Sequence, residues 1–207
     1  MNSTELPAHL LSKKPFAEII ESSISSWLAQ SWNWQISPTL GSLMKAKFAD
    51  LTIFGVVYYI KTGSSDQSRI TYPFGKTQEE LLSEQPQIFE FLSTTFNCLT
   101  LGYIQNNKLF YHLAPKPPQI HTFVEEANDE ELKLFFLSPH YLQLIFSLSH
   151  QIFSIDELLI ALLKNLVDKN LLTKIILDKF IQTYSVLITH EYGRLKLFLR
   201  RIQPLII

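Results

Sequence analysis

The chain has 207 residues, of which 46% are hydrophobic, and its 18 basic and 19 acidic side chains leave a formal net charge of −1. This apolar content can fill a sizeable core and excludes intrinsic disorder, and the balanced charge excludes a strongly basic nucleic-acid coat. The single cysteine, Cys98, excludes a disulfide framework and any multi-cysteine metal cluster. It favours a reducing compartment, so we expect a cytoplasmic protein, with contact to a membrane surface left open.

Residues 1–43 are expected to form an N-terminal arm followed by an amphipathic helix. Residues 15–31 carry apolar side chains at helical spacing, at positions 16, 19, 20, 24, 27 and 28. Pro15 suits a first helical turn, while Pro38 and Gly41 end the pattern. The segment before Pro15 lacks a basic start with an apolar run behind it, so we expect an arm rather than a secretory signal.

Residues 44–124 are expected to form a small antiparallel β-barrel with inserted helices. Residues 46–61 are rich in β-branched and aromatic side chains and predict a long strand, in which Gly55 indicates a bulge. A short strand is expected over 69–72. The capping box T-x-x-E then begins a helix at Thr77.

The end of the same segment predicts a hairpin and then a connector. Residues 96–105 and 108–113 read as strands, and the two asparagines between them suit a tight turn. The prolines that follow, within residues 114–121, stop regular structure and indicate an extended connector. We place the main domain boundary there.

Residues 125–207 are expected to form a helical region packed on the barrel. The acidic run at its start suits a helix N-terminus, and Ser154 with Glu157 forms a second capping box. Residues 173–202 predict one long helix with a bend at Gly193. The expected fold class is therefore α+β: an N-terminal amphipathic helix, a small antiparallel barrel and a C-terminal helical region.

The longest stretch without Asp, Glu, Lys or Arg runs from Leu134 to Ile155. Its length invites a test for a membrane span. The stretch contains Pro139 together with histidines, glutamines and serines. The polar groups of these side chains would lack hydrogen-bond partners in lipid. We predict no transmembrane span.

No catalytic, cofactor-binding or metal-ligating residue is predicted. The tripeptide at 75–77 has the order of a P-loop ending, but Ile70 stands where the first glycine is required and Pro73 lacks an N–H group. The histidines show no metal-binding spacing. Cys98 lies in an apolar strand and is expected to be a buried thiol, although His112 on the neighbouring strand keeps a cryptic nucleophile as a third hypothesis.

Two groups of residues are candidates for interaction. The first consists of Trp27, Trp32 and Trp34, which would either anchor a partner or a membrane interface, or pack on the barrel with Trp27 in the core. We favour packing, because aromatic side chains dominate core burial.

The second group ends the last helix and consists of Arg194, Lys196, Arg200 and Arg201. These bases either complement the helix dipole or form a patch for the phosphates of nucleic acid, for anionic lipid or for an acidic partner. Acidic residues outnumber basic ones over residues 77–137, and the reverse holds over residues 171–207. The chain is therefore expected to have two oppositely charged faces.

Residues 72–103 and 106–126 resemble the HAS-barrel family, the small β-barrel shared by HerA-type DNA-translocating ATPases and ATP-synthase subunits. The likeness is strongest to stand-alone cyanobacterial HAS-barrel proteins. It lies in the strand around Gly102-Tyr103, the next strand and the proline-rich exit PKPPQIHTFV. The resemblance implies a barrel that acts as a docking collar between subunits. A HerA-type motor would continue into a P-loop domain, whereas this chain continues into helices.

We therefore expect a non-catalytic interaction or assembly protein that docks onto a larger complex through a protein partner, without a cofactor. The alternative is an accessory factor in DNA processing, associated with a HerA-type system, in which the basic helix end would contact phosphates. Peripheral contact with a membrane stays open.

Overall fold

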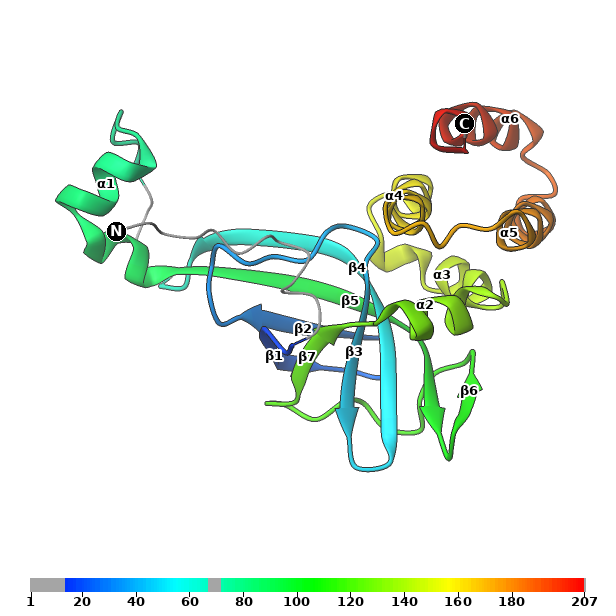
Figure 1. Cartoon of the computed structure of the whole chain (residues 1–207), viewed down its shortest axis with the longest axis horizontal. Coiled ribbons are helices and arrows are strands. Elements are labelled where there is room, and N and C mark those ends of the chain that lie inside the picture. The colour runs from blue at the N-terminus through cyan, green and yellow to red at the C-terminus, as the bar shows by residue number, and fades with distance from the viewer. Residues whose placement is uncertain (1–13, 67–71, 207) are drawn as a thin grey trace.

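Seven antiparallel strands form one sheet in the computed structural model of the chain, which describes residues 14–66 and 72–206 (Figure 1). The order of the strands is β2-β1-β7-β3-β4-β5-β6, and β2 also pairs with β5. This extra pairing closes six strands into a barrel and leaves β6 outside the ring. The strands are β1 (Ala17–Ser22), β2 (Ser26–Ser31), β3 (Leu43–Phe48), β4 (Leu51–Ser64), β5 (Leu92–Gln105), β6 (Lys108–Phe110) and β7 (Phe123–Glu126).

The predicted N-terminal helix is wrong, because residues 17–31 form the hairpin β1–β2 of the barrel. Burial in β2 alternates strictly, with Trp27, Ala29 and Ser31 inside, which is the period of a strand. The serines between the strands make the turn, where the Ser23 hydroxyl accepts a hydrogen bond from the Ser26 amide at 3.1 Å. Local side-chain bonds of this kind compete with helix formation. The expected arm at 1–13 lies outside the described residues.

Trp27 fills the barrel interior, and Gly55 makes room for it. A Cβ atom on Gly55 would lie 2.9 Å from the Cβ of Cys98 and 3.0 Å from the indole of Trp27. The pairing of β4 with β5 shifts register between Phe54 and Gly55, which confirms the predicted bulge. The thiol of Cys98 is fully buried in the same cluster, as expected.

The sheet extends beyond the predicted barrel segment, 44–124, in both directions. Strands β1 and β2 precede it, and β7 ends at Glu126 after pairing with β1 and β3. The proline-rich connector therefore returns the chain to the barrel instead of leaving it. The hairpin β5–β6 is confirmed, with Asn106 and Asn107 at φ values of 50° and 59°.

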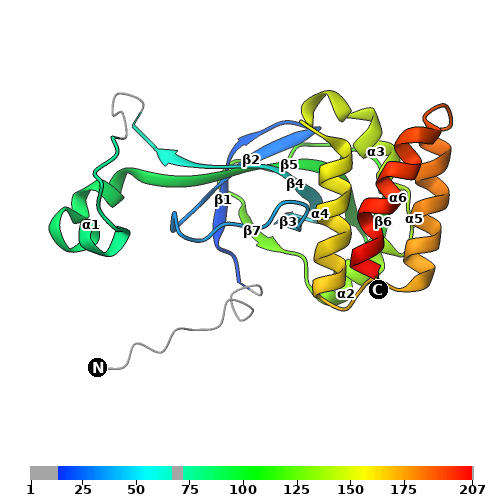
Figure 2. The same cartoon turned by 90° about the horizontal axis from the view of Figure 1, so that it is seen from above.

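Strands β4 and β5 continue past the barrel as a two-stranded ribbon that carries the helix α1 (Gln78–Glu84) and the 3₁₀ helix η2 (Pro86–Phe91) (Figures 1 and 2). The capping box predicted at Thr77 is present, since its hydroxyl accepts from the Glu80 amide and the Glu80 carboxylate accepts from the Thr77 amide. The strand expected over 69–72 lies outside the described residues except for Tyr72, which has no regular structure.

The helical region packs on the outer face of β4 and β5, as Figure 2 shows. Phe54 and Leu99 from the barrel share one core with Phe135, Leu142 and Leu162 from the helices. The elements are α2 (Asp129–Phe136), α3 (Tyr141–Ser147), η3 (Ser149–Gln151), α4 (Ile155–Asp168), α5 (Lys174–Leu187) and α6 (Tyr192–Ile206). Among the described residues, no helix is both long enough and apolar enough to cross a membrane.

The single long helix predicted over residues 173–202 is instead two helices, α5 and α6, which break between Ile188 and Glu191. Tyr184 of α5 and Phe198 of α6 bring their rings to 4.4 Å, so the chain has folded back on itself. Packing this pair removes more apolar surface from water than a straight helix would. The bend was expected at Gly193, whereas the break between the two helices precedes that residue.

Candidate interaction surfaces

Arg194 is the anchor that holds the start of α6 on α4. Its guanidinium donates to both carboxylate oxygens of Asp156, with distances of 2.8 to 3.1 Å, and the Tyr184 hydroxyl donates to the same carboxylate at 3.0 Å. The hydrogen bonds to Asp156 raise the pKa of Arg194 against the opposing effect of burial. Burial and the same carboxylate raise the pKa of Tyr184. Arg194 is thus a structural cation.

Of the four bases predicted as a phosphate patch, two have no ionic partner among the residues that the structure describes. Arg201 pairs with Glu157 at 2.7 Å, so its charge is balanced within the chain, as is that of Arg194. Lys196 and Arg200 are exposed and make no ion pair with any described residue. The structure therefore divides the predicted group into two bases that are paired within the chain and two that are unpaired among the described residues.

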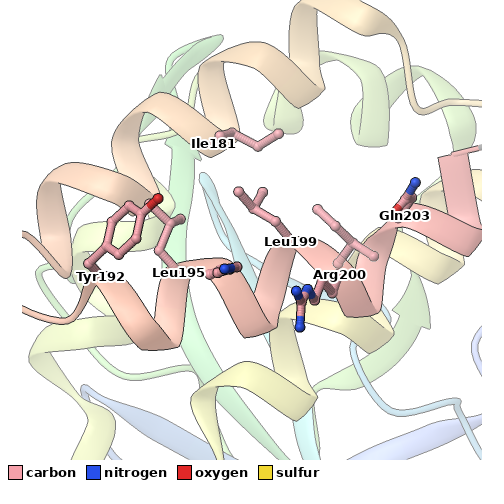
Figure 3. A pocket seen from close by; sticks show the side chains of 8 residues that line it. Ile181, Tyr192, Leu195, Leu199, Arg200 and Gln203 are labelled. Carbon is pink, nitrogen blue, oxygen red and sulfur yellow. The ribbon is translucent and has the colours of Figure 1, made fainter.

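Lys196 and Arg200 border a groove of about 470 Å³ on α6 and α5 (Figure 3). Ile181 of α5 points toward Leu199 of α6, and Leu195 continues the apolar floor along α6. Tyr192 lies at one end of the groove with 76% of its surface exposed. An apolar floor with cationic edges suits an amphipathic segment that carries acidic side chains.

The three tryptophans do not form one surface. Trp27 is buried, as favoured from the sequence, and its indole N–H has no hydrogen-bond partner. Trp34 stacks on Phe89 of η2 at 5.5 Å and so fastens the ribbon to the loop after β2. Trp32 is 55% exposed and meets Phe123 edge-on at 5.1 Å.

Trp32 also lines a cleft of about 550 Å³ beside Phe16, Ile36 and Met44. The acidic residue at its border, Glu126, is already paired with Lys169 at 2.7 Å. The remaining polar lining comes from Lys14, which precedes β1, and from uncharged polar side chains of the loop after β2. The cleft does not define a class of ligand.

The tip of the ribbon, residues 72–91, is a second unusual surface, and we call it the arm tip. Neither α1 nor η2 contains a buried residue. Tyr72, Phe74 and Leu82 expose 64%, 44% and 42% of their surface. The acidic side chains of the arm tip are Glu79, Glu80, Glu84 and Glu90, against one base, Lys76.

The candidates for chemistry are not brought together. Cys98 is fully buried, and burial raises the pKa of its thiol well above the ordinary value. His112, proposed as its base, is exposed and packs against Tyr103 and Phe110 in a separate cluster. Among the described residues, no group of three His, Cys, Asp or Glu side chains is arranged to hold a metal ion. Thr77, the last residue of the tripeptide that was compared with a P-loop, serves as the N-cap of α1.

No family model matches the chain, and no curated protein matches its sequence.

Sequence reasoning missed the groove because it read α5 and α6 as one helix. A signal was present: Leu195, Leu199 and Ile202 follow helical spacing after the polar pair Thr189-His190. The arm tip was also missed as a surface. Its capping box was found, but only tertiary structure reveals that the helix behind it contains no buried residue.

Proposed function

We propose that this chain is a non-catalytic interaction and assembly protein that docks onto a larger complex. The observation that carries the proposal is the groove on α5 and α6, with its apolar floor and the two bases Lys196 and Arg200, which make no ion pair with the described part of the chain. Exposed apolar patches edged by charge are typical of protein-binding surfaces. The partner segment would be an amphipathic helix with acidic side chains.

The proposal includes membership of the HAS-barrel family. The closed antiparallel barrel and its proline-rich connector support that relation, and the family resemblance implies a docking role between subunits. A cytoplasmic location is part of the same proposal, because the one cysteine forms no disulfide and lies in the core.

A role in DNA processing is the weaker alternative. Its support was the basic end of α6, where Asp156 and Glu157 now neutralise two of the four bases. Two free cations release few counterions, so binding to phosphates would be weak and only shallowly dependent on salt.

The test is a pull-down of the tagged chain from its native cells, with and without nuclease. We compare the natural chain with K196E/R200E, which reverses the charges of the groove, and with K47E/K108E, which reverses two exposed charges on barrel hairpins. A stoichiometric protein partner that survives nuclease, binds K47E/K108E and is lost by K196E/R200E supports the proposal. Equal recovery with both variants would contradict it, and partners that vanish with nuclease would favour the DNA alternative.

A further inference from the structure

The arm tip is a helical segment that the described residues of its own chain leave uncovered. Helix α1 has seven residues and no buried side chain. Isolated helices of this length are marginal in water, even with a capping box. The exposed Tyr72, Phe74 and Leu82 add apolar surface to the same tip. A surface that covers these side chains would stabilise the helix and remove the apolar patch from water.

The groove on α5 and α6 has the complementary character. Its floor is formed by Ile181, Leu195 and Leu199, and the charged residues that line it, Lys196 and Arg200, are both basic. Helix α6 contains four bases and no acid, whereas the arm tip contains four acids and one base. One acid of the arm tip, Glu84, pairs internally with Lys76, and Glu79 and Glu90 make no ion pair with the described residues.

The two surfaces cannot meet within one molecule. Helix α1 lies at one end of the long axis, and α5 and α6 lie at the other, with the barrel between them (Figures 1 and 2). The ribbon and the helices are both attached to the barrel through β4 and β5. A contact between arm tip and groove therefore requires two chains.

We propose that the arm tip of one copy docks into the α5–α6 groove of a second copy. The inference rests on the proposed function, since it names the occupant of the same groove. Such a contact is head-to-tail: each copy keeps a free arm tip at one end and a free groove at the other. Repetition gives an open filament or, if the rotation closes, a ring.

The mass of the purified full-length chain in solution, measured by sedimentation at increasing protein concentration, provides the first test. We expect association at about 0.05 M salt and dissociation at about 1 M salt, because screening weakens the charged contacts. A monomer at all protein concentrations at low salt would overturn the inference.

Two charge-reversal variants give the decisive experiment. E79K/E90K alters the arm tip without touching its helix cap, and K196E/R200E alters the groove. Each variant alone should associate at least about tenfold more weakly than the natural chain. An equimolar mixture should associate more tightly than either variant alone, because the natural arm tip of one variant meets the natural groove of the other, and the two reversed surfaces are also complementary in charge. The control K47E/K108E should associate like the natural chain.

A mixture that associates no more tightly than either variant alone would overturn the arm-in-groove contact. If the natural chain is monomeric but a cellular partner still depends on Lys196 and Arg200, the docking function stands and only the second copy is wrong. If neither self-association nor a groove-dependent partner is found, both proposals fail. Circular dichroism of each variant establishes that it is folded before either result is read.

Discussion

Gly55 shows how one missing side chain determines the barrel interior. A methyl group there would stand 2.9 Å from Cys98 and 3.0 Å from Trp27, closer than packed atoms approach. The sequence indicated a bulge at this position, but it could not reveal that the bulge exists beside a tryptophan. That residue had been assigned to a helix, since its neighbours also fit helical spacing.

We predict that Gly55→Ala destabilises the fold by about 1–3 kcal/mol, the usual cost of overpacking a core. Urea unfolding followed by circular dichroism measures the change. Gly63→Ala is the matched control on the same strand, because a Cβ atom there has its nearest neighbour at 4.0 Å. Equal stability of the two variants would contradict the packing argument.

Because Tyr111 is partly buried, we predict that the free energy of unfolding falls at alkaline pH. Burial raises its pKa to about 12, from an ordinary value of 10, and its hydroxyl donates to the Phe135 carbonyl at 2.6 Å. The unfolded chain releases the proton first, so stability is complete below pH 10 and falls as the pH rises toward 12. Phenolate absorbance and unfolding free energy against pH measure this. Tyr111→Phe should show a shallower fall, and an unchanged slope would refute the assignment.

At the scale of elements, α6 is fixed to α4 by two ion pairs of unequal strength. Arg194 and Asp156 are mostly buried and share three hydrogen bonds, whereas Arg201 and Glu157 each remain about half exposed. Desolvated, multiply bonded pairs are costly to break, while exposed ones contribute little.

We therefore predict that Arg194→Met costs about 1.5–3 kcal/mol of unfolding free energy, since it leaves the Asp156 carboxylate with fewer donors. Arg201→Met should cost less than about 1 kcal/mol. Thermal or urea unfolding of the two variants makes the comparison. Similar costs for both would show that Arg194 is not the anchor of α6.

The elements predicted correctly share strong local signals. The turn at Asn106-Asn107 and the capping box at Thr77 depend on neighbours within a few residues, and both are present. Other local readings failed when distant packing decided the outcome. Glu125 and Glu126 were placed in a helix, but they pair with β3, where Lys45 bonds Glu125 at 3.2 Å. The helix begins later, behind the cap of Asn128.

Of the two hydrogen bonds that make up the second capping box, only one is formed, because a tertiary contact competes for the Glu157 side chain. The Ser154 hydroxyl accepts from the Glu157 amide, as expected, but the Glu157 carboxylate turns away to pair with Arg201. A sequence window cannot show this choice, because the competing cation lies on another helix. The candidate basic patch was misjudged for the same reason.

At the scale of the whole molecule, the β4–β5 ribbon with its arm tip and the barrel have separate roles. The core clusters contain residues of the barrel and of the C-terminal helices, and no buried residue comes from α1 or η2. The ribbon is fastened mainly by its own strand pairing and by the stack of Trp34 on Phe89.

We predict that replacing residues 66–91 by a short Gly-Ser turn leaves the barrel and the C-terminal helices folded. Because the removed segment adds no buried side chain in α1 or η2, the unfolding free energy should change by less than about 1 kcal/mol, within the range of surface changes. Urea unfolding and circular dichroism measure this. Loss of cooperative unfolding would mean that residues 66–91 are part of the folded core.

The pairing of β7 with β1 has a consequence for folding while the chain is being synthesised on the ribosome. Ala17 pairs with Val124, so the first of the described strands completes its pairing only after the last of them has been synthesised. Until Glu126 is synthesised, β1 and β3 each present an unpaired edge to the surrounding solvent, and such edges can pair with other unfinished chains. The barrel therefore cannot close before β7 is synthesised, and the interval before closure is when the growing chain is most exposed to aggregation.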